Sequence, residues 1–172
     1  DEVTISMVAE KAAGAEAPDP FGLNDYFGFP NLPFLIFGKL AEAVGGVTLL
    51  AMRAVHATSG LAIVAVAYFF FREFFRRGAA AAATVLLGAN HALLAISRMA
   101  MRDNTGLLFE LFAFTVLLVA LRRKSLPIAF TGGVAAALTF YAYYPSRITI
   151  IIWFFLLATL SLIRRARFPW AL

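Results

Sequence analysis

Beyond residue 46, long apolar stretches alternate with short polar breaks. A membrane-spanning helix needs about 20 mostly apolar residues, and short connections between such stretches are typical of a helical bundle. The pattern predicts an all-α polytopic membrane bundle of about five transmembrane helices over residues 47–167, with residues 168–172 as a cytoplasmic tail. The five predicted spans are residues 47–71, 78–96, 105–121, 126–143 and 148–163.

Residues 1–46 are more polar and predict an extracytoplasmic loop that carries two short interfacial helices. Apolar and polar residues are mixed over 2–13, which favours an amphipathic helix ending near Gly14. Four prolines and two glycines make residues 15–33 an irregular loop. Pro33 can open a second short helix, which we expect to stop at Gly45 and Gly46.

The composition excludes several classes of protein. Of the 172 residues, 62% are hydrophobic and 15% are charged, whereas a soluble domain has roughly 45–50% apolar residues. A disordered chain, a nucleic-acid-binding domain and an ordinary soluble enzyme are therefore excluded. The absence of cysteine also excludes a disulfide scaffold and a thiolate metal site.

The basic residues set the predicted orientation. Three basic clusters follow the first, third and fifth spans, so with five spans they fall on one face, which the positive-inside rule makes cytoplasmic. The clusters are Arg72, Arg76 and Arg77; Arg122, Arg123 and Lys124; and Arg164, Arg165 and Arg167. We therefore expect an integral protein of the cytoplasmic (inner) membrane. Glu73 is expected to be solvated and to pair with Arg77 at i+4.

The remaining polar residues fall on the external face, at three separate places. Asp1 and Glu2 open the amphipathic helix, where a carboxylate serves either as a helix cap or as a general base at the membrane surface. Arg147 follows a proline turn before the last span. It is interpreted as an interfacial anchor or as a binder of a phosphate or carboxylate.

The most polar stretch among the spans is residues 97–105. Arg98 and Arg102 are four residues apart, so on a helix they share a face and would form an anion site suited to phosphate. In the alternative interpretation Arg102 snorkels, Asp103 caps the next helix, and Arg98 pairs with Asp103. Glu110 lies about 10 Å deeper than Asp103 at 1.5 Å per residue, and an acid there needs a polar partner.

Two histidines complete the candidates. Arg53 and His56 are three apart and are expected to share a face, for interfacial packing or an interhelical hydrogen bond more than for catalysis. His91, Asp1 and Asp103 have no recognisable metal-ligand spacing. No metal site is therefore predicted, although a divalent metal remains possible.

The order of these features resembles the GT-C-fold glycosyltransferases. The branch is that of the dolichyl-phosphate-mannose–protein mannosyltransferases and the lipid A aminoarabinose transferases. An outward Asp-Glu pair, an amphipathic helix, a Gly/Pro-rich loop and a span with an early Arg follow one another as in that family's first external loop. Residues 98–103 are similar to its turn with Arg five residues before Asp, and residues 132–147 to its Gly-rich span ending in Tyr-x-x-x-Arg.

The resemblance implies an inverting sugar transfer from a polyprenyl-phosphate donor. It makes Asp1 the residue that deprotonates or orients the acceptor, Asp103 the acid of the second loop, and Arg98 a partner of phosphate or carboxylate. Aminoarabinose transferases have a Glu-Lys pair before Pro-Pro, whereas Gly28 and Phe29 precede Pro30 here, so that ligand set is absent. Because the family's members are longer, the chain is expected to be an N-terminal part without activity by itself.

The sequence thus predicts part of a membrane glycosyltransferase, with Asp1 and Asp103 as catalytic residues and Glu2, Arg98, Arg102 and Arg147 as substrate- or phosphate-binding residues. The expected partners are a polyprenyl-phosphate sugar, membrane lipids and other membrane-protein chains, but no nucleic acid. The alternative is a non-catalytic, transferase-like subunit of a larger membrane complex. A transporter is a third interpretation, but the inverted repeats and broken midplane helices typical of transporters are not recognisable in the sequence.

Overall fold

The structure, a computed structural model, describes residues 2–14, 19–23, 30–99, 103–143 and 145–167. Within these ranges the regular structure is helical, and an isolated bridge joins Leu23 and Pro30. The elements are α1 (Glu2–Ala13), α2 (Leu32–Val44), α3 (Leu49–Arg72), α4 (Arg77–Gly88), α5 (His91–Arg98), α6 (Asp103–Arg123), α7 (Leu126–Ala142), η1 (Pro145–Arg147) and α8 (Ile148–Arg167).

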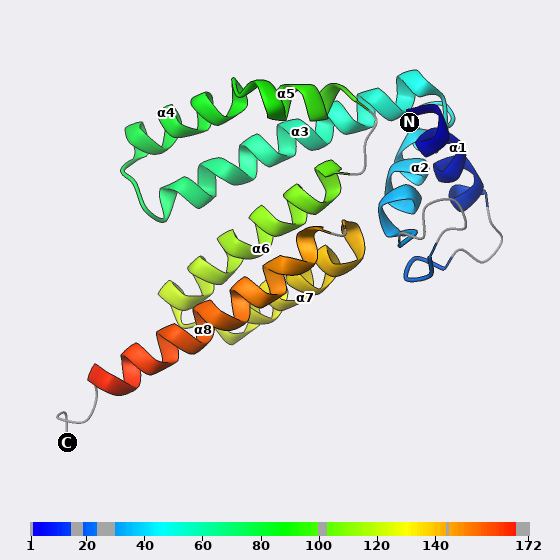
Figure 1. The fold of residues 1–172 in the computed structure, drawn as a ribbon. Coiled ribbons are helices and arrows are strands. Elements are labelled where there is room, and N and C mark those ends of the chain that lie inside the picture. Colours follow the sequence, from blue (N-terminus) through cyan, green and yellow to red (C-terminus); the bar gives the residue numbers. More distant parts are fainter. Residues whose placement is uncertain (1, 15–18, 24–29, 100–102, 144, 168–172) are drawn as a thin grey trace.

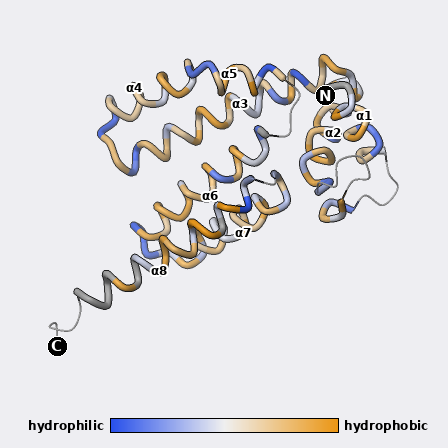
Figure 2. Tube along the Cα trace, viewed as in Figure 1, coloured by the Kyte–Doolittle hydropathy of each residue, from blue (hydrophilic) through white to orange (hydrophobic). Residues whose placement is uncertain are grey.

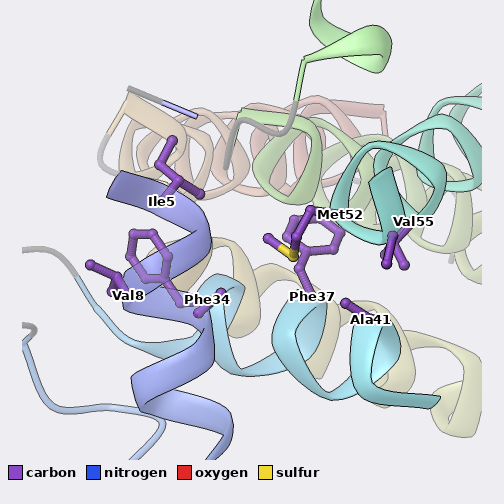
Figure 3. Packing of buried hydrophobic residues seen from close by; sticks show 9 residues of the cluster. Ile5, Val8, Phe34, Phe37, Ala41, Met52 and Val55 are labelled. Atoms are coloured by element: carbon purple, nitrogen blue, oxygen red, sulfur yellow. The ribbon is translucent and has the colours of Figure 1, made fainter. Parts of the chain in front are cut away.

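The two short N-terminal helices lie at one end of the bundle (Figure 1). Residues 1–46, which the sequence predicts to be extracytoplasmic, are called the external unit below. Helix α2 has Pro33 in its first turn and ends at Gly45, whose φ of 131° suits glycine. At Gly38 a Cβ would lie 2.5 Å from the backbone O of Ala9, so glycine lets α2 approach α1 closely. Figure 3 shows apolar side chains of α1, α2 and the start of α3 meeting in one buried cluster.

The remaining helices run back and forth along a common direction (Figure 1). Helix α3 packs against α4 and α5 and also against α6, while α7 packs against α6 and α8. At the crossing of α6 and α7, a Cβ on Gly132 would lie 3.3 Å from Val116, and the Trp153 ring of α8 stacks on Phe114 at 5.6 Å between centroids. Small residues allow such close contacts between membrane helices.

The bundle contains helices that are long and apolar enough to cross a membrane. Leu49–Arg72 and Asn104–Arg123 satisfy this test individually, and α4 with α5 satisfy it together. The apolar helices Leu126–Ala142 and Pro145–Thr159 are shorter. Figure 2 shows hydrophobic residues along all of these helices. An integral, all-helical membrane chain with two to three candidate spans is therefore confirmed, and the count of five stays a prediction.

The second predicted span, residues 78–96, is divided into two helices. Helix α4 ends at Gly88, α5 begins at His91, and the two are bent by 56°. The cause is local, because the Asn90 side-chain oxygen accepts hydrogen bonds from the backbone N of Ala92 at 2.9 Å and of Leu93 at 3.3 Å. Asparagine is a preferred N-cap, so a new helix starts here.

The expected pairing of Glu73 is also wrong. Its carboxylate lies 3.3 Å from the guanidinium of Arg122 at the end of α6, and the Glu73 side chain is only 12% exposed. The ends of α3 and α6 meet here, so a partner on a neighbouring helix replaces the expected i+4 partner, Arg77. The contact places the first two predicted cytoplasmic clusters at the same end of the bundle.

Candidate functional site

The candidate site lies at the opposite end of the bundle, beside α1 and α2. The start of α3, the end of α5, the start of α6 and the turn between α7 and α8 all lie at this end (Figure 1). These are the elements that carry the polar positions singled out in the sequence. The external unit also reaches the end of α7, because the rings of Phe21 and Tyr141 are 4.8 Å apart in an edge contact.

One turn of α3 receives both flanks of the connection between α5 and α6. On one flank, the side-chain amide of Asn104 donates a hydrogen bond of 3.2 Å to the backbone O of His56, and both residues are fully buried. On the other flank, a Cβ on Gly60 would lie 2.7 Å from the Cβ of Ser97. Glycine at position 60 therefore allows the end of α5, next to Arg98, to lie directly on α3.

The first turn of α6 also lies against the turn between α7 and α8. A Cβ on Gly106 would lie 2.5 Å from the Ser146 hydroxyl oxygen and 2.7 Å from the Cβ of Tyr143. Glycine at position 106 therefore permits this contact. The segments that carry Arg98, Asp103 and Arg147 are thus brought to one end of the bundle, although they are far apart in the sequence.

The two described arginines of the site have different environments. Arg98 closes α5 and is exposed. Arg147 is half-buried, its guanidinium lies 4.5 Å from the centre of the Phe140 ring, and its Nε donates to the backbone O of Phe140 at 3.3 Å. Stacking on an aromatic ring agrees with the interpretation of Arg147 as an anchor.

His56 lies where the external unit meets the bundle. Its Nδ1 is 2.7 Å from the backbone O of Met52, and its ring is 4.0 Å from the Phe37 ring of α2. Arg53 is exposed whereas His56 is buried. Three residues advance a helix by about 300°, so the two positions are only about 60° apart around α3, and the boundary between buried and exposed residues falls between them.

A second polar contact lies one to two helical turns below the start of α6. Glu110 of α6 accepts a hydrogen bond of 2.5 Å from the hydroxyl of Thr149 in α8. Thr149 is buried and Glu110 half-buried. The polar partner that an acid at this depth requires is thus a neutral hydroxyl on a neighbouring helix, and the contact joins α6 to α8.

The acids of the candidate site are only partly within the described residues. Asp1 and Arg102 lie outside them, and so do the side chains of Glu2 and Asp103, although the backbone places these two at the starts of α1 and α6. The convergence of Asp1, Arg98 and Asp103, and the two-arginine anion site, stay predictions. Among the described residues there is no group of three potential metal ligands.

Sequence reasoning missed Asn104, Gly60 and Gly106. Asn104 is fully buried, and its Oδ1 has no hydrogen-bond partner among the described residues. The sequence did contain a signal for Asn104, because burying a polar amide at the start of an apolar helix costs free energy unless the amide has a hydrogen-bond partner. Only the three-dimensional arrangement identifies that partner as a carbonyl on α3, 48 residues earlier.

This end of the bundle therefore carries Arg98 and Arg147 beside apolar helices. Such an arrangement suits an amphiphile with an anionic head group and a hydrocarbon chain. In comparison with known proteins, the sequence model of one family, described as dolichyl-phosphate-mannose-protein mannosyltransferase, matches residues 30–172, more than half of the chain. No curated protein and no solved structure matches.

Proposed function

The chain belongs to the dolichyl-phosphate-mannose-protein mannosyltransferase family, and from this premise we propose that it transfers a sugar from a polyprenyl-phosphate donor at the extracytoplasmic face of the cytoplasmic membrane. The family consists of membrane glycosyltransferases with lipid-linked sugar donors. We add three points to this family function: the donor is a polyprenyl monophosphate, the anomeric configuration inverts, and the reaction takes place at the extracytoplasmic face.

The proposed step is a single displacement at the anomeric carbon. The acceptor hydroxyl oxygen forms a bond to this carbon while the bond from the carbon to the phosphate oxygen breaks, so the configuration inverts. Asp1 accepts the hydroxyl proton as a general base, and the polyprenyl phosphate leaves with the electron pair. Asp103 lies at the start of α6 and is proposed to orient the sugar or the acceptor.

The arginines are proposed to stabilise the departing phosphate. Negative charge develops on the phosphate as the sugar leaves, and fixed guanidinium groups stabilise such charge in a site that excludes water. Arg98, Arg102 and Arg147 are assigned this role, with Glu2 as a further substrate contact. Because the donor carries its own activated bond, no nucleotide-binding loop is required.

One observation carries the proposal beyond family membership. The packing of Gly60 on Ser97, of Asn104 on His56, and of Gly106 on Ser146 gathers the ends of three membrane helices beneath the external unit. Polar residues in a membrane chain point to function. Here they gather at the end opposite the ion pair of Glu73 and Arg122, the end that the positive-inside rule makes external.

A transfer assay tests the proposal. The protein expressed from its complete reading frame is purified and incubated with radiolabelled polyprenyl-phosphate mannose and a cell extract as the source of acceptors. We expect label to move from the lipid to the acceptor and free polyprenyl phosphate to accumulate. The assay is repeated with EDTA and with added Mg²⁺ or Mn²⁺, which decides whether a divalent metal is needed.

The test variant and its matched control change one arginine at each end of the bundle. Arg98→Ala should weaken donor binding, whereas Arg76→Ala, on an exposed residue beyond α3, should leave transfer unchanged. Binding of the donor lipid without any transfer would contradict the enzyme and favour the alternative of a non-catalytic subunit.

A further inference from the structure

We propose that His56 and Asn104 are positioning residues that hold the external unit and the start of α6 in one fixed arrangement. The inference rests on the proposed function, because it concerns the spacing between the two acids assigned to the reaction. It names residues that carry no reacting group. They act by joining α1 and α2, which follow Asp1, to α6, which begins with Asp103.

The first half of the connection is the contact between rings. Phe37 of α2 is 4% exposed and belongs to the same buried cluster as Ile5 and Val8 of α1. Its ring lies 4.0 Å from the His56 ring, with an angle of 37° between the two planes. A displacement of the external unit against the bundle must therefore move Phe37 across His56.

The orientation of the His56 ring is fixed from its own helix. A backbone carbonyl only accepts hydrogen bonds, so at 2.7 Å from the O of Met52 the Nδ1 of His56 carries the hydrogen and donates it. The ring is therefore held along α3 and presents a fixed face to Phe37. An apolar ring of similar size would keep the contact with Phe37 but lose this bond.

The second half of the connection starts from the backbone of the same residue. The Asn104 amide donates to the His56 carbonyl at 3.2 Å, and Asn104 directly follows Asp103 in the sequence. Because Asn104 is fully buried, water does not compete for this bond. The first turn of α6 is thus tied to the residue that supports the external unit.

The end of α5 is set against the same turn, since Gly60 lies one turn beyond His56 and contacts Ser97. The segments next to Asp1, Arg98 and Asp103 are therefore all positioned by contacts with one turn of α3, residues 56–60. Groups that react together must be held within about 0.5 Å of the productive geometry. A change of about 1 Å from a substitution far from the reacting atoms can cost about 100-fold in rate.

The test compares a buried asparagine, Asn104, with a helix-capping asparagine, Asn90, in the protein expressed from its complete reading frame. Asn104→Leu removes the bond to His56, and Asn90→Ala removes the cap of α5, at the end of that helix away from Arg98. We expect Asn104→Leu to lower kcat about 10- to 100-fold, as for a small misplacement, while the donor KM stays within about threefold. Asn90→Ala should lower the thermal midpoint without this split between kcat and KM.

A second pair of variants keeps the inference testable if Asn104→Leu does not fold. His56→Phe keeps a ring against Phe37 but loses the bond to Met52, and His91→Phe changes the exposed histidine at the start of α5. We expect a loss of kcat for His56→Phe and no change for His91→Phe. Equal kcat for Asn104→Leu and Asn90→Ala, or an unchanged His56→Phe, would overturn the inference.

A distance measurement separates this inference from the proposed function. The chain has no cysteine, so nitroxide labels can be attached at Glu10→Cys in α1 and Leu107→Cys in α6, both exposed positions. Asn104→Leu should broaden the distance distribution between the labels, and Asn90→Ala should not. If the unsubstituted protein transfers no sugar, the proposed function fails, and the width of this distribution alone decides the positioning role.

Discussion

The two ends of the bundle are held together by different means. At the end beside the external unit, called the outer end after its predicted orientation, α3 and α6 are joined by a fully buried amide and carbonyl, those of Asn104 and His56. At the inner end, the same two helices are joined by Arg122 and Glu73, and the Arg122 side chain is 63% exposed. A neutral polar pair is thus fully buried at one end, whereas at the other a mostly buried carboxylate, that of Glu73, pairs with an exposed arginine.

The difference is consistent with different tasks at the two ends. A buried polar group is costly without a partner, so the outer contacts hold only in one geometry, which a site requires. An ion pair with one exposed partner contributes about 1 kcal/mol or less and tolerates movement. Two glycines at the outer end, Gly60 and Gly106, make close contacts between elements, whereas Gly78 near the inner end has no neighbour within 4 Å of a Cβ.

The sharpest contrast between the ends is topological. A single cysteine at Lys124 should not react with an impermeant maleimide added to intact cells, whereas a cysteine at Arg98 should react fully. The reason is that Lys124 belongs to a basic cluster retained inside, and Arg98 lies at the other end of the bundle. The chain itself has no cysteine, so the background is clean. Labelling of position 124 from outside would reverse the assignment of the two ends.

The next largest difference concerns carboxylates. Asp1→Asn should lower transfer about 100- to 10,000-fold, the range for loss of a general base. Donor binding should be largely kept, since a base acts in the transition state. Glu73→Gln at the inner end is the matched control and should retain activity. Direct binding of labelled donor, measured beside the transfer rate, checks this; equal losses in both variants would remove Asp1 from its assigned role.

Close packing at the outer end gives a third, smaller effect. Gly60→Ala adds a methyl group 2.7 Å from the Cβ of Ser97 and should destabilise the protein by about 1–3 kcal/mol, as for overpacking. Gly133→Ala, in open space on α7, should be neutral or slightly stabilising, because alanine favours helix. Thermal unfolding in detergent measures both.

The double variant Gly60→Ala with Ser97→Gly provides the check on this explanation. Removing the Ser97 side chain frees the space that the new methyl group needs, so most of the lost stability should return. Failure of this rescue would show that the close approach of α5 to α3 is not the cause.

Most of the helices could be predicted from the sequence, because apolar runs between polar breaks leave few alternatives in a membrane chain. The predicted second interfacial helix, for example, is α2, opened by Pro33 and closed by Gly45. The break at Asn90 was missed because apolarity continues across it, although Gly88 and Asn90 together are a recognisable helix stop and start.

The contacts between distant segments could not be predicted. Glu73 had an acceptable partner four residues away, and nothing in one sequence shows that Arg122 is nearer. As an amide in an apolar helix, Asn104 could be expected to need a hydrogen-bond partner. The sequence does not show that this partner is the backbone carbonyl of His56. The sequence identified the arginines and acids of the candidate site by chemistry, while the residues that hold those segments in place follow from packing alone.

The smallest effect should come from the inner ion pair. Glu73→Gln should lower stability by less than about 1 kcal/mol, because Arg122 is exposed and water screens the pair. The loss should shrink further when salt is raised from about 0.01 M to 1 M, since the Debye length falls from about 30 Å to 3 Å. Thermal unfolding of both proteins at the two salt concentrations measures this difference. By contrast, the neutral bond between Asn104 and His56 should be insensitive to salt, so Asn104→Leu should lose the same stability in both buffers. A large, salt-independent loss for Glu73→Gln would mean that the inner end also depends on buried polar contacts, and the contrast between the two ends would not hold.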